Sequence, residues 1–424
     1  MKSNGPLRVA LYDPSGHGGI CHYTYQLATS LARWGADVTV VTTEGYELRH
    51  LERNFKLKPW FRKSRIKSLA ANILARLRGN VFSNSHGRSA RRPLNSSADR
   101  KVVGFLKRLR LRCQLYKGSL EWLLRRPDIV HVQWLIDCDG DYDWIRLLKL
   151  FGIKIVYTAH DLLPNTNPSL EHHWLLGRIY RKVDAIVVHG EASKDEMVSV
   201  FGLDPAKIYV IPHGSNELVS TNRQTSKQAA REKLGIGSAH RVILFFGIIK
   251  PYKGLEYLVQ AFEEVKTQVR NSLLLVVGGI YDGDAEAFHY YADLIDQIRR
   301  RDDVLCVPHY IPFEKISDYF CAADLVVLPY TKTYTSGVLL AAYAAGRPVV
   351  ATDTGALKEA VETGRSGLVV PPKDAKALSR AIVEIFNRRD IEEMGRYAKH
   401  LAETKYSWTG VALKTSELYR SLAA

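Results

Sequence analysis

Two lysines in the second half of the chain could bind a diphosphate. Lys250 and Lys253 follow an apolar strand predicted at 242–246 and come just before a helix predicted from about Leu255. A helix start offers oriented backbone N–H groups, and lysine adds positive charge, so both would stabilise phosphate oxygens. Two solvated surface lysines would be the structural alternative.

A second candidate anion site lies further along the chain. Ser336, Gly337 and Val338 follow a loop and begin a predicted helix. Backbone N–H groups at such a helix start favour a bound anion. An ordinary N-cap serine would explain the same residues if they stood alone.

A histidine and an aspartate could perform proton transfer. His160 and Asp161 follow a buried strand predicted at 154–157. Because open α/β sheets bind ligands at the carboxyl ends of their strands, this pair is expected at a binding site. Either side chain could take a proton from a hydroxyl group. The alternative is an aspartate that begins the next turn beside a hydrogen-bonded histidine.

The first predicted strand ends in a glycine-rich turn. Gly16, Gly18 and Gly19 would let the backbone approach a phosphate closely, and they precede a helix predicted from Tyr23. The dinucleotide fingerprint G-x-G-x-x-G requires a third glycine where Cys21 stands, which disfavours a nicotinamide-dependent dehydrogenase. A turn that needs glycine only for its shape remains possible.

The elements that must position these residues form two series. Each series alternates short apolar runs with stretches of helical period, which predicts doubly wound α/β domains with parallel sheets. The predicted strands are 8–12, 38–41, 127–132, 154–157, 185–188 and 209–212 in the first series, and 242–246, 273–277, 304–307, 325–328 and 348–351 in the second.

No metal or cofactor site is predicted. The aspartates at 137, 139, 141 and 143 lack the glycine and the terminal glutamate of a calcium loop, so they are interpreted as a solvated loop. The five cysteines are odd in number and form no C-x-x-C, which argues against a disulfide framework and a zinc site and is typical of a reducing cytosol.

Five motifs in a fixed order carry a resemblance to a known family. The chain resembles the GT-B enzymes of glycosyltransferase family 4, which use nucleotide-sugars, and the similarity is strongest from Phe246 to Pro372. The motifs are Phe246 to Gly254, Ala322 to Tyr330, Ser336 to Leu340, Ala344 to Thr352, and Gly364 to Gly367 followed by 368–372.

The resemblance implies a role for each candidate. Lys250 and Lys253 would bind the diphosphate of the donor, with Ile248 standing where the family often has an arginine. Ser336, Gly337 and Val338 would hold the distal phosphate and the sugar, and Gly18 and Gly19 would face the donor or the acceptor. His160 would lie near the reacting centre with Asp161. A UDP- or GDP-sugar is then the expected substrate, with no cofactor and no catalytic metal.

The chain departs from the family at two positions. Many members carry two glutamates eight positions apart, and the matching residues here are Thr333 and Ala341. The loss of both carboxylates indicates a variant that holds its donor through backbone amides near Ser336 and Gly337. It also leaves open a retaining or an inverting outcome.

The resemblance also implies a division into parts. The expected N-terminal acceptor-side domain is 1–215, with an insertion at about 53–126. A linker at 216–240, containing a short helix, leads to a nucleotide-sugar domain at 241–405. A closing helix at 406–424 would pack back on the N-terminal domain.

The insertion is strongly basic. Between Arg53 and Arg126 it has 21 Lys/Arg and only two acidic residues, while the whole chain carries a net charge of +16. Apolar residues accompany the cations, with Ile66, Leu69, Ile73 and Leu77 at helical spacing, and 79–100 is expected to be a mobile loop. This composition favours an anionic membrane surface or a lipid-linked acceptor, although a solvated basic insertion would share it. The residues chosen for this contact are Arg62, Lys63, Arg65, Lys67, Lys107 and Arg108.

The combined expectation is a cytoplasmic, peripheral membrane glycosyltransferase of surface polysaccharide assembly. No apolar run reaches the length of about 20 residues that a spanning helix needs, and the N-terminus has no signal-peptide pattern. A non-catalytic GT-B binding subunit is the main alternative. A basic nucleic-acid-binding protein ranks lower, because the chain has no nucleic-acid-binding motif.

Overall fold

The computed structural model describes residues 5–62, 97–164, 169–216 and 225–424. They form two compact units. The first comprises 1–158, 178–184 and 419–424, and the second comprises 159–177 and 185–418. The helix expected around Ile66 to Leu77 and most of the loop expected at 79–100 lie outside the described residues. Residues 97–100 begin a helix and are not a loop.

The first sheet has seven strands in the order β3-β2-β1-β4-β5-β6-β7, with parallel pairing at the recorded neighbours. Its first five strands belong to the first unit and its last two to the second. The strands are β1 (Arg8–Tyr12), β2 (Asp37–Thr43), β3 (Lys56–Phe61), β4 (Ile129–Val132), β5 (Lys154–Thr158), β6 (Ala185–Val188) and β7 (Ile208–Val210). The edge strand β3 was not predicted.

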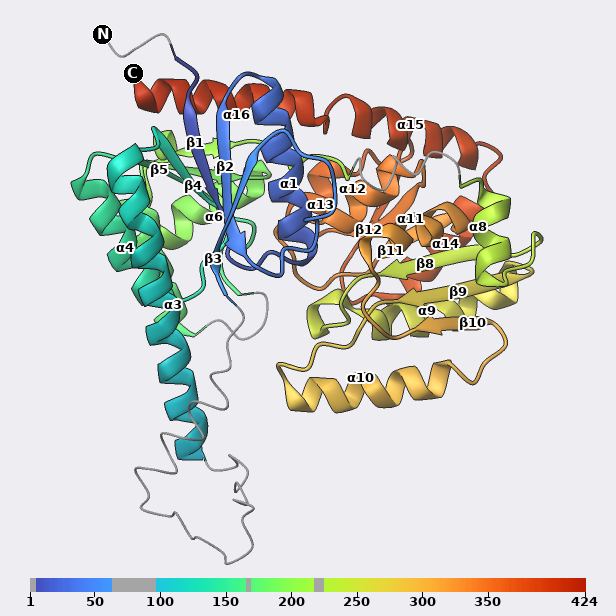
Figure 1. Ribbon diagram of the computed structural model, residues 1–424. Helices are drawn as coiled ribbons and strands as arrows, with labels where there is room; N and C mark the ends of the chain where they lie inside the picture. Colours follow the sequence, from blue (N-terminus) through green and yellow to red (C-terminus); the bar gives the residue numbers. More distant parts are fainter. Residues whose placement is uncertain (1–4, 63–96, 165–168, 217–224) are drawn as a thin grey trace, which may run out of the picture. The chain divides into compact units, whose positions relative to one another are not determined.

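Helices separate these strands, as the two-series pattern predicted, except between β2 and β3 (Figure 1). They are α1 (Gly18–Arg33), α3 (Ser97–Arg125), α4 (Cys138–Leu150), α5 (Leu170–Lys182) and α6 (Glu191–Phe201).

An aromatic cluster forms much of the core of the first unit. The ring of Trp144 lies 4.7 Å from that of Tyr12 and 5.8 Å from that of Trp122. Trp122 on α3 in turn packs at 4.5 Å on Trp60 of β3, and Phe61 is only 3% exposed. The apolar side chains of β3 therefore stabilise the fold of the first unit.

The second sheet has six parallel strands in the order β10-β9-β8-β11-β12-β13. They are β8 (Arg241–Phe246), β9 (Ser272–Val277), β10 (Val304–Val307), β11 (Leu325–Leu328), β12 (Val349–Thr352) and β13 (Gly367–Val370). Strand residues alternate between two apolar clusters: Val242 and Leu244 enter one, and Ile243 and Phe245 the other. The predicted α/β class with two Rossmann-like parallel sheets is confirmed.

Helices cover both faces of this sheet (Figure 1). Helices α8, α11, α12, α13 and α15 contribute to one cluster, and α9, α10 and α14 to the other. Their bounds are α8 (Lys227–Leu234), α9 (Leu255–Gln268), α10 (Ala285–Ile298), α11 (Phe313–Ala322), α12 (Gly337–Ala344), α13 (Ala356–Ala360), α14 (Ala375–Asn387) and α15 (Ile391–Glu403), followed by α16 (Trp408–Ala423).

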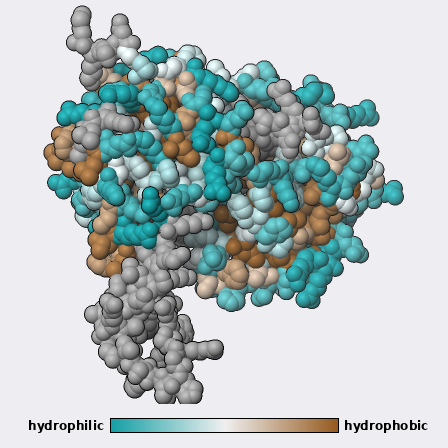
Figure 2. Space-filling model, in the orientation of Figure 1, coloured by the Kyte–Doolittle hydropathy of each residue, from teal (hydrophilic) through white to brown (hydrophobic). Residues whose placement is uncertain are grey.

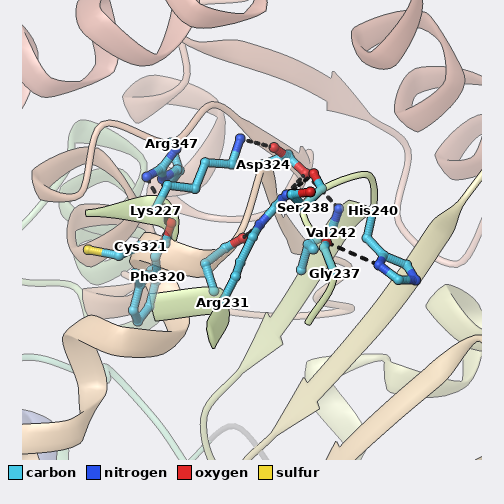
Figure 3. A network of polar contacts seen from close by, with 11 residues as sticks. Lys227, Arg231, Gly237, Ser238, His240, Val242, Phe320, Cys321, Asp324 and Arg347 are labelled. Atoms are coloured by element: carbon cyan, nitrogen blue, oxygen red, sulfur yellow. Dashed lines mark hydrogen bonds and ion pairs between the residues drawn. The ribbon is translucent and has the colours of Figure 1, made fainter. Parts of the chain in front are cut away.

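A buried carboxylate ties α8 to the sheet (Figure 3). Asp324, which precedes β11, accepts hydrogen bonds from the backbone N–H of Val242 at 2.7 Å and from the guanidinium of Arg231 at 2.8 Å. Lys227 forms a further ion pair with it. Arg231 is 5% exposed and also donates to the carbonyl of Ala322, so its charge and donors have partners inside the domain.

The surface is largely polar. Figure 2 shows hydrophilic residues over much of the visible face, interrupted by smaller apolar areas. Within the described ranges, no helix is both long enough and apolar enough to cross a membrane.

Candidate functional site

Three histidines stand at the carboxyl ends of neighbouring strands. His160 lies two residues after β5, His189 directly follows β6, and His213 lies three residues after β7. The ring centres of His160 and His189 are 5.1 Å apart, and those of His189 and His213 are 5.2 Å apart. Because parallel strands end at the same sheet edge, residues far apart in sequence form one cluster here.

Two hydrogen bonds fix this cluster. Nε2 of His189 lies 3.2 Å from Nδ1 of His160, and Nδ1 of His189 lies 3.0 Å from the carbonyl oxygen of Ile211. His160 is 7% exposed and His189 is 9% exposed. Both rings are thus held by partners on adjacent strand ends.

His213 connects the cluster to the start of α12. Its Nδ1 lies 2.7 Å from the carbonyl oxygen of Gly214, and burial lowers the pKa of the imidazole to about 4. The ring is therefore neutral at pH 7. Its Cε1 lies about 4.0 Å from the place that a Cβ on Gly337 would occupy. A side chain at position 337 would therefore narrow the gap between His213 and the start of α12.

Lys250 and Lys253 lie over aromatic rings. Nζ of Lys253 is 3.9 Å from the centre of the Tyr330 ring, and Nζ of Lys250 is 4.0 Å from that of Tyr281. Burial lowers the pKa of both lysines, and the negative charge of Asp161 opposes that shift in each. The predicted acid–base residue Asp161 and the two predicted phosphate ligands thus share one electrostatic environment.

The start of α12 lies beside the same lysine. Ser336 is the N-cap, and its Oγ accepts a hydrogen bond from the N–H of Leu339 at 3.3 Å. It also lies 3.5 Å from the hydroxyl of Tyr330, whose ring contacts Lys253. The predicted helix start at Ser336 to Val338 is confirmed as local structure.

Lys253 lies just before α9, which starts at Leu255 as the sequence predicted. Lys253 ends a short 3-10 turn, Pro251–Lys253, and α9 begins only after Gly254. Gly254 has φ +64°, and a Cβ there would lie 2.1 Å from the carbonyl oxygen of Pro329. The close approach of these two backbones brings Lys253 next to Tyr330.

Two family models together match most of the chain. Residues 17–217 match Glycosyltransferase Family 4, and residues 240–388 match Glycosyl transferases group 1. The chain belongs to the GT-B glycosyltransferases. A D-inositol 3-phosphate glycosyltransferase of Gordonia bronchialis is 27% identical over 295 residues, which are 66% of this chain. The matched region makes up 63% of that relative, so this chain spans less than two thirds of the relative's length.

Solved structures share the fold of this glycosyltransferase. Sucrose-phosphate synthase from Thermosynechococcus elongatus has a TM-score of 0.70 at 19% identity, over 98% of this chain and 99% of that chain. Anabaena HepE in complex with UDP and glucose has a TM-score of 0.69 at 17% identity, over 98% and 100%.

The glycine turn of this glycosyltransferase is shaped by carboxylates. The N–H of Gly18 donates to Oε2 of Glu47 at 2.8 Å, so an acidic side chain already lies at the start of α1. Asp13 accepts hydrogen bonds from Ser15 and Gly16, while burial raises the pKa of its carboxyl. A Cβ on Gly18 or on Gly19 would meet no atom within 4 Å. The phosphate role assigned to Gly18 and Gly19 stays a prediction.

The two residues that stand in place of the family glutamates make local structural contacts. Ala341 is 3% exposed in the core, and the hydroxyl of Thr333 donates to the carbonyl of Thr335 at 2.8 Å. Other carboxylates lie near this loop. The hydroxyl of Tyr334 donates to Glu196 of α6 at 3.1 Å.

A cavity of about 170 Å³ lies beside the histidines and the N-cap of α12. Its lining includes His189, His213, Ser336 and Glu359. The two carboxylate oxygens of Glu359 accept hydrogen bonds at 2.8–2.9 Å from the first two N–H groups of α6. Negative charge at a helix N-terminus stabilises that helix.

The aspartate cluster is not a solvated loop. Asp141 is 2% exposed within α4 and accepts hydrogen bonds from the N–H groups of Ile136 and Asp137 at 2.7 and 2.9 Å. Asp137 is paired with Arg112 at 2.7 Å. Among the described residues, no three His, Cys, Asp or Glu side chains form a group that could hold a metal ion.

The basic residues chosen for membrane or acceptor contact are only partly described. Lys63, Arg65 and Lys67 lie outside the described residues, and Lys107 is known only to lie in α3. Arg62 is exposed and paired with Glu44 at 3.2 Å, and Arg108 is exposed on α3.

The sequence-based selection of catalytic residues omitted His189 and His213. The signal was present, since each histidine closely follows an apolar run already predicted as a strand. Three histidines at successive strand ends predict a cluster once the order β5-β6-β7 is assumed.

Proposed function

We propose that this protein transfers a hexosyl group from a UDP- or GDP-sugar to a glycan or lipid-linked acceptor, in the assembly of surface polysaccharide. The observation that carries this proposal is that Lys253 and the N-cap of α12 both contact Tyr330, while the negative charge of Asp161 acts on Lys253. The UDP and glucose named for Anabaena HepE are consistent with such a donor. No cofactor is required, because the nucleotide-sugar is itself the substrate.

Lys250 and Lys253 would stabilise the leaving nucleoside diphosphate. Negative charge grows on the bridging phosphate oxygen as its bond to the sugar breaks, and an ammonium held in a partly buried site stabilises that charge strongly. The start of α12 at Ser336 would add backbone N–H groups on the distal phosphate and the sugar. This arrangement would compensate for the absence of the two family glutamates.

His160 and Asp161 would act on the sugar side. If the enzyme inverts, one of them takes the proton of the acceptor hydroxyl. If it retains, His160 instead positions the donor sugar. The three-histidine cluster supports either role, because it fixes the ring of His160 before substrate binds.

Helix α3 would bring the enzyme to an anionic membrane or acceptor. Phe105, Leu109 and Leu120 are 59%, 48% and 61% exposed, and their spacing places them on one side of the helix. Exposed cations accompany them on α3, at Arg108 and Lys117. Apolar side chains among cations are typical of helices that lie in a membrane interface. The resulting location is peripheral, on the cytoplasmic face of the membrane.

A panel of UDP- and GDP-sugars tests the proposal through donor hydrolysis and thermal shift. One donor should raise the melting temperature and be hydrolysed. Replacing Lys253 with alanine should lower kcat/KM by about 100-fold to 1,000-fold, as for other groups that stabilise developing charge. Lys376→Ala, at an exposed position of α14, is the control and should change neither readout. A panel without binding or hydrolysis would contradict the proposed donor class.

A non-catalytic binding subunit is the second candidate function. The observation that favours it is the presence of Thr333 and Ala341 where the family has glutamates. Donor binding with a normal thermal shift but no hydrolysis and no transfer to any acceptor would support it.

A further inference from the structure

The hydrogen bonds around His189 determine which nitrogen of His160 carries a proton. The carbonyl oxygen of Ile211 can only accept, so Nδ1 of His189, at 3.0 Å, is the donor. In a neutral His189 ring Nε2 then has a lone pair and accepts from Nδ1 of His160 at 3.2 Å. A neutral His160 with its proton on Nδ1 has an unprotonated Nε2.

We propose that His189 is a positioning residue that holds His160 in the Nδ1–H tautomer, so that Nε2 of His160 accepts a hydrogen bond from a substrate hydroxyl. This inference rests on the proposed glycosyl transfer and deepens it. It makes His160 a hydrogen-bond acceptor toward the substrate and not a donor. An acceptor suits both roles left open above: a base for the acceptor hydroxyl, or a partner for a hydroxyl of the donor sugar.

The neighbouring His213 is consistent with a hydrogen bond that runs from His160 to His189. His213 also packs against His189, with the two ring centres 5.2 Å apart and the ring planes inclined at 67°. Its own Nδ1 faces the carbonyl oxygen of Gly214, so it too is a donor at that atom. Both rings thus direct an Nδ1 proton at a backbone carbonyl. His189 is only 9% exposed, and reversing its hydrogen bonds would leave the carbonyl oxygen of Ile211 without this donor.

Two substitutions at position 189 separate the tautomer from simple packing. Leucine fills similar volume but cannot accept a hydrogen bond. Glutamine can place its side-chain oxygen near the position of Nε2 and can therefore still accept from His160. We expect His189→Leu to lower kcat by at least about tenfold with little change in KM for the donor, and His189→Gln to restore most of the loss. In a His160→Ala background, His189→Leu should cost nothing further.

The tautomer of His160 can be tested without a nucleotide-sugar, by long-range proton–nitrogen NMR spectra of the protein with isotope-labelled histidine. The His160 signals, identified by their absence in His160→Ala, should show a protonated Nδ1 and an unprotonated Nε2, and His189→Leu should abolish that preference. An Nε2–H tautomer of His160 in the unmodified protein, or a doubly protonated His189, would overturn the proposal. The spectrum of the unmodified protein tests the proposed tautomer even if the leucine variant does not fold. A confirmed tautomer with no donor turned over would instead contradict the proposed function alone.

Discussion

Asp141 is a carboxyl group that the fold has taken out of water. Burial raises its pKa from 3.8 to about 7, although the N–H groups of Asp137 and Ile136 and the hydroxyl of Tyr12 oppose the shift. The folded state therefore binds the proton more tightly than the unfolded state. The stability gained from this is fully present below the unfolded pKa and is lost as the pH rises through about 7.

Asp141→Asn should remove that dependence on pH. A tenfold change in a protonation equilibrium is about 1.4 kcal/mol, so the raised pKa corresponds to about 4 kcal/mol. The asparagine variant should match the original protein near pH 4 and exceed its free energy of unfolding near pH 8. Urea unfolding across that range measures the difference. Asp139→Asn is the control: this side chain lies two residues earlier and is exposed, so its substitution should leave the pH profile unchanged. If the stability of Asp141→Asn instead varied with pH as that of the original protein does, the interpretation would be refuted.

At the scale of elements, the turn before α9 depends on one glycine. Gly254 combines a positive φ with a backbone carbonyl at 2.1 Å from the place of a Cβ, so alanine cannot fit without moving β11 or the turn. Gly235, at the C-cap of α8, has a similar φ of +68° but open space around it. An alanine at either position would have to adopt an unfavourable positive φ, but only at Gly254 would its Cβ also collide with a backbone carbonyl oxygen.

Gly254→Ala should therefore destabilise the protein by several kcal/mol, while Gly235→Ala should cost only about 1–2 kcal/mol for the left-handed conformation. If Gly254→Ala remains folded, donor binding should weaken because Lys253 is displaced. Denaturant unfolding and thermal shift with the donor measure both effects. Equal losses in the two variants would mean that the backbone approach at Pro329 is unimportant.

The contact of α8 with the second sheet depends on a buried ion pair. Asp324→Ala would leave the guanidinium of Arg231 without its carboxylate in a buried position, which typically costs about 3–5 kcal/mol. Asp296→Ala breaks an exposed pair with Arg299 and should cost less than about 1 kcal/mol. Thermal and urea unfolding of both variants would compare them, and a loss below about 1 kcal/mol for Asp324→Ala would show that water reaches the network.

At the scale of the whole molecule, charge is concentrated in one insertion. The segment from Arg53 to Arg126 has 21 basic and two acidic residues, so the rest of the chain is slightly acidic. Attraction to an anionic surface should then act mainly through this segment and weaken with salt, because the Debye length shortens from about 10 Å at 0.1 M to about 3 Å at 1 M.

Vesicle binding tests this charge distribution. We expect the protein to bind phosphatidylglycerol vesicles, to ignore phosphatidylcholine vesicles and to dissociate in high salt. The double substitution of Phe105 and Leu109 by serine should weaken binding by about tenfold or more, since each removes apolar area that would enter the interface. Leu150→Ser, at an 84% exposed position of α4, is the matched control. Binding that is unaffected by the double substitution would place the contact elsewhere.

The sequence by itself determined the elements and the local motifs. Apolar runs and helical periods are local, so they predicted the α/β class, nearly all strands of both sheets and the helix start at Ser336. The edge strand β3 was missed because its lysines and Pro59 hide an apolar face that only packing against α3 reveals. The burial of Asp141 was missed for the same reason, since polar residues in a row are usually solvated.

Only the tertiary structure decided which residues act together. His160 and His189 are 29 positions apart, and Asp161 precedes Lys250 by nearly ninety residues, yet strand order and helix packing bring each set together. Such proximity depends on sheet order and on the register of distant strands, which a local periodicity does not encode. The same is true of hydrogen-bond direction: the proton on His160 is determined by a carbonyl group on another strand end.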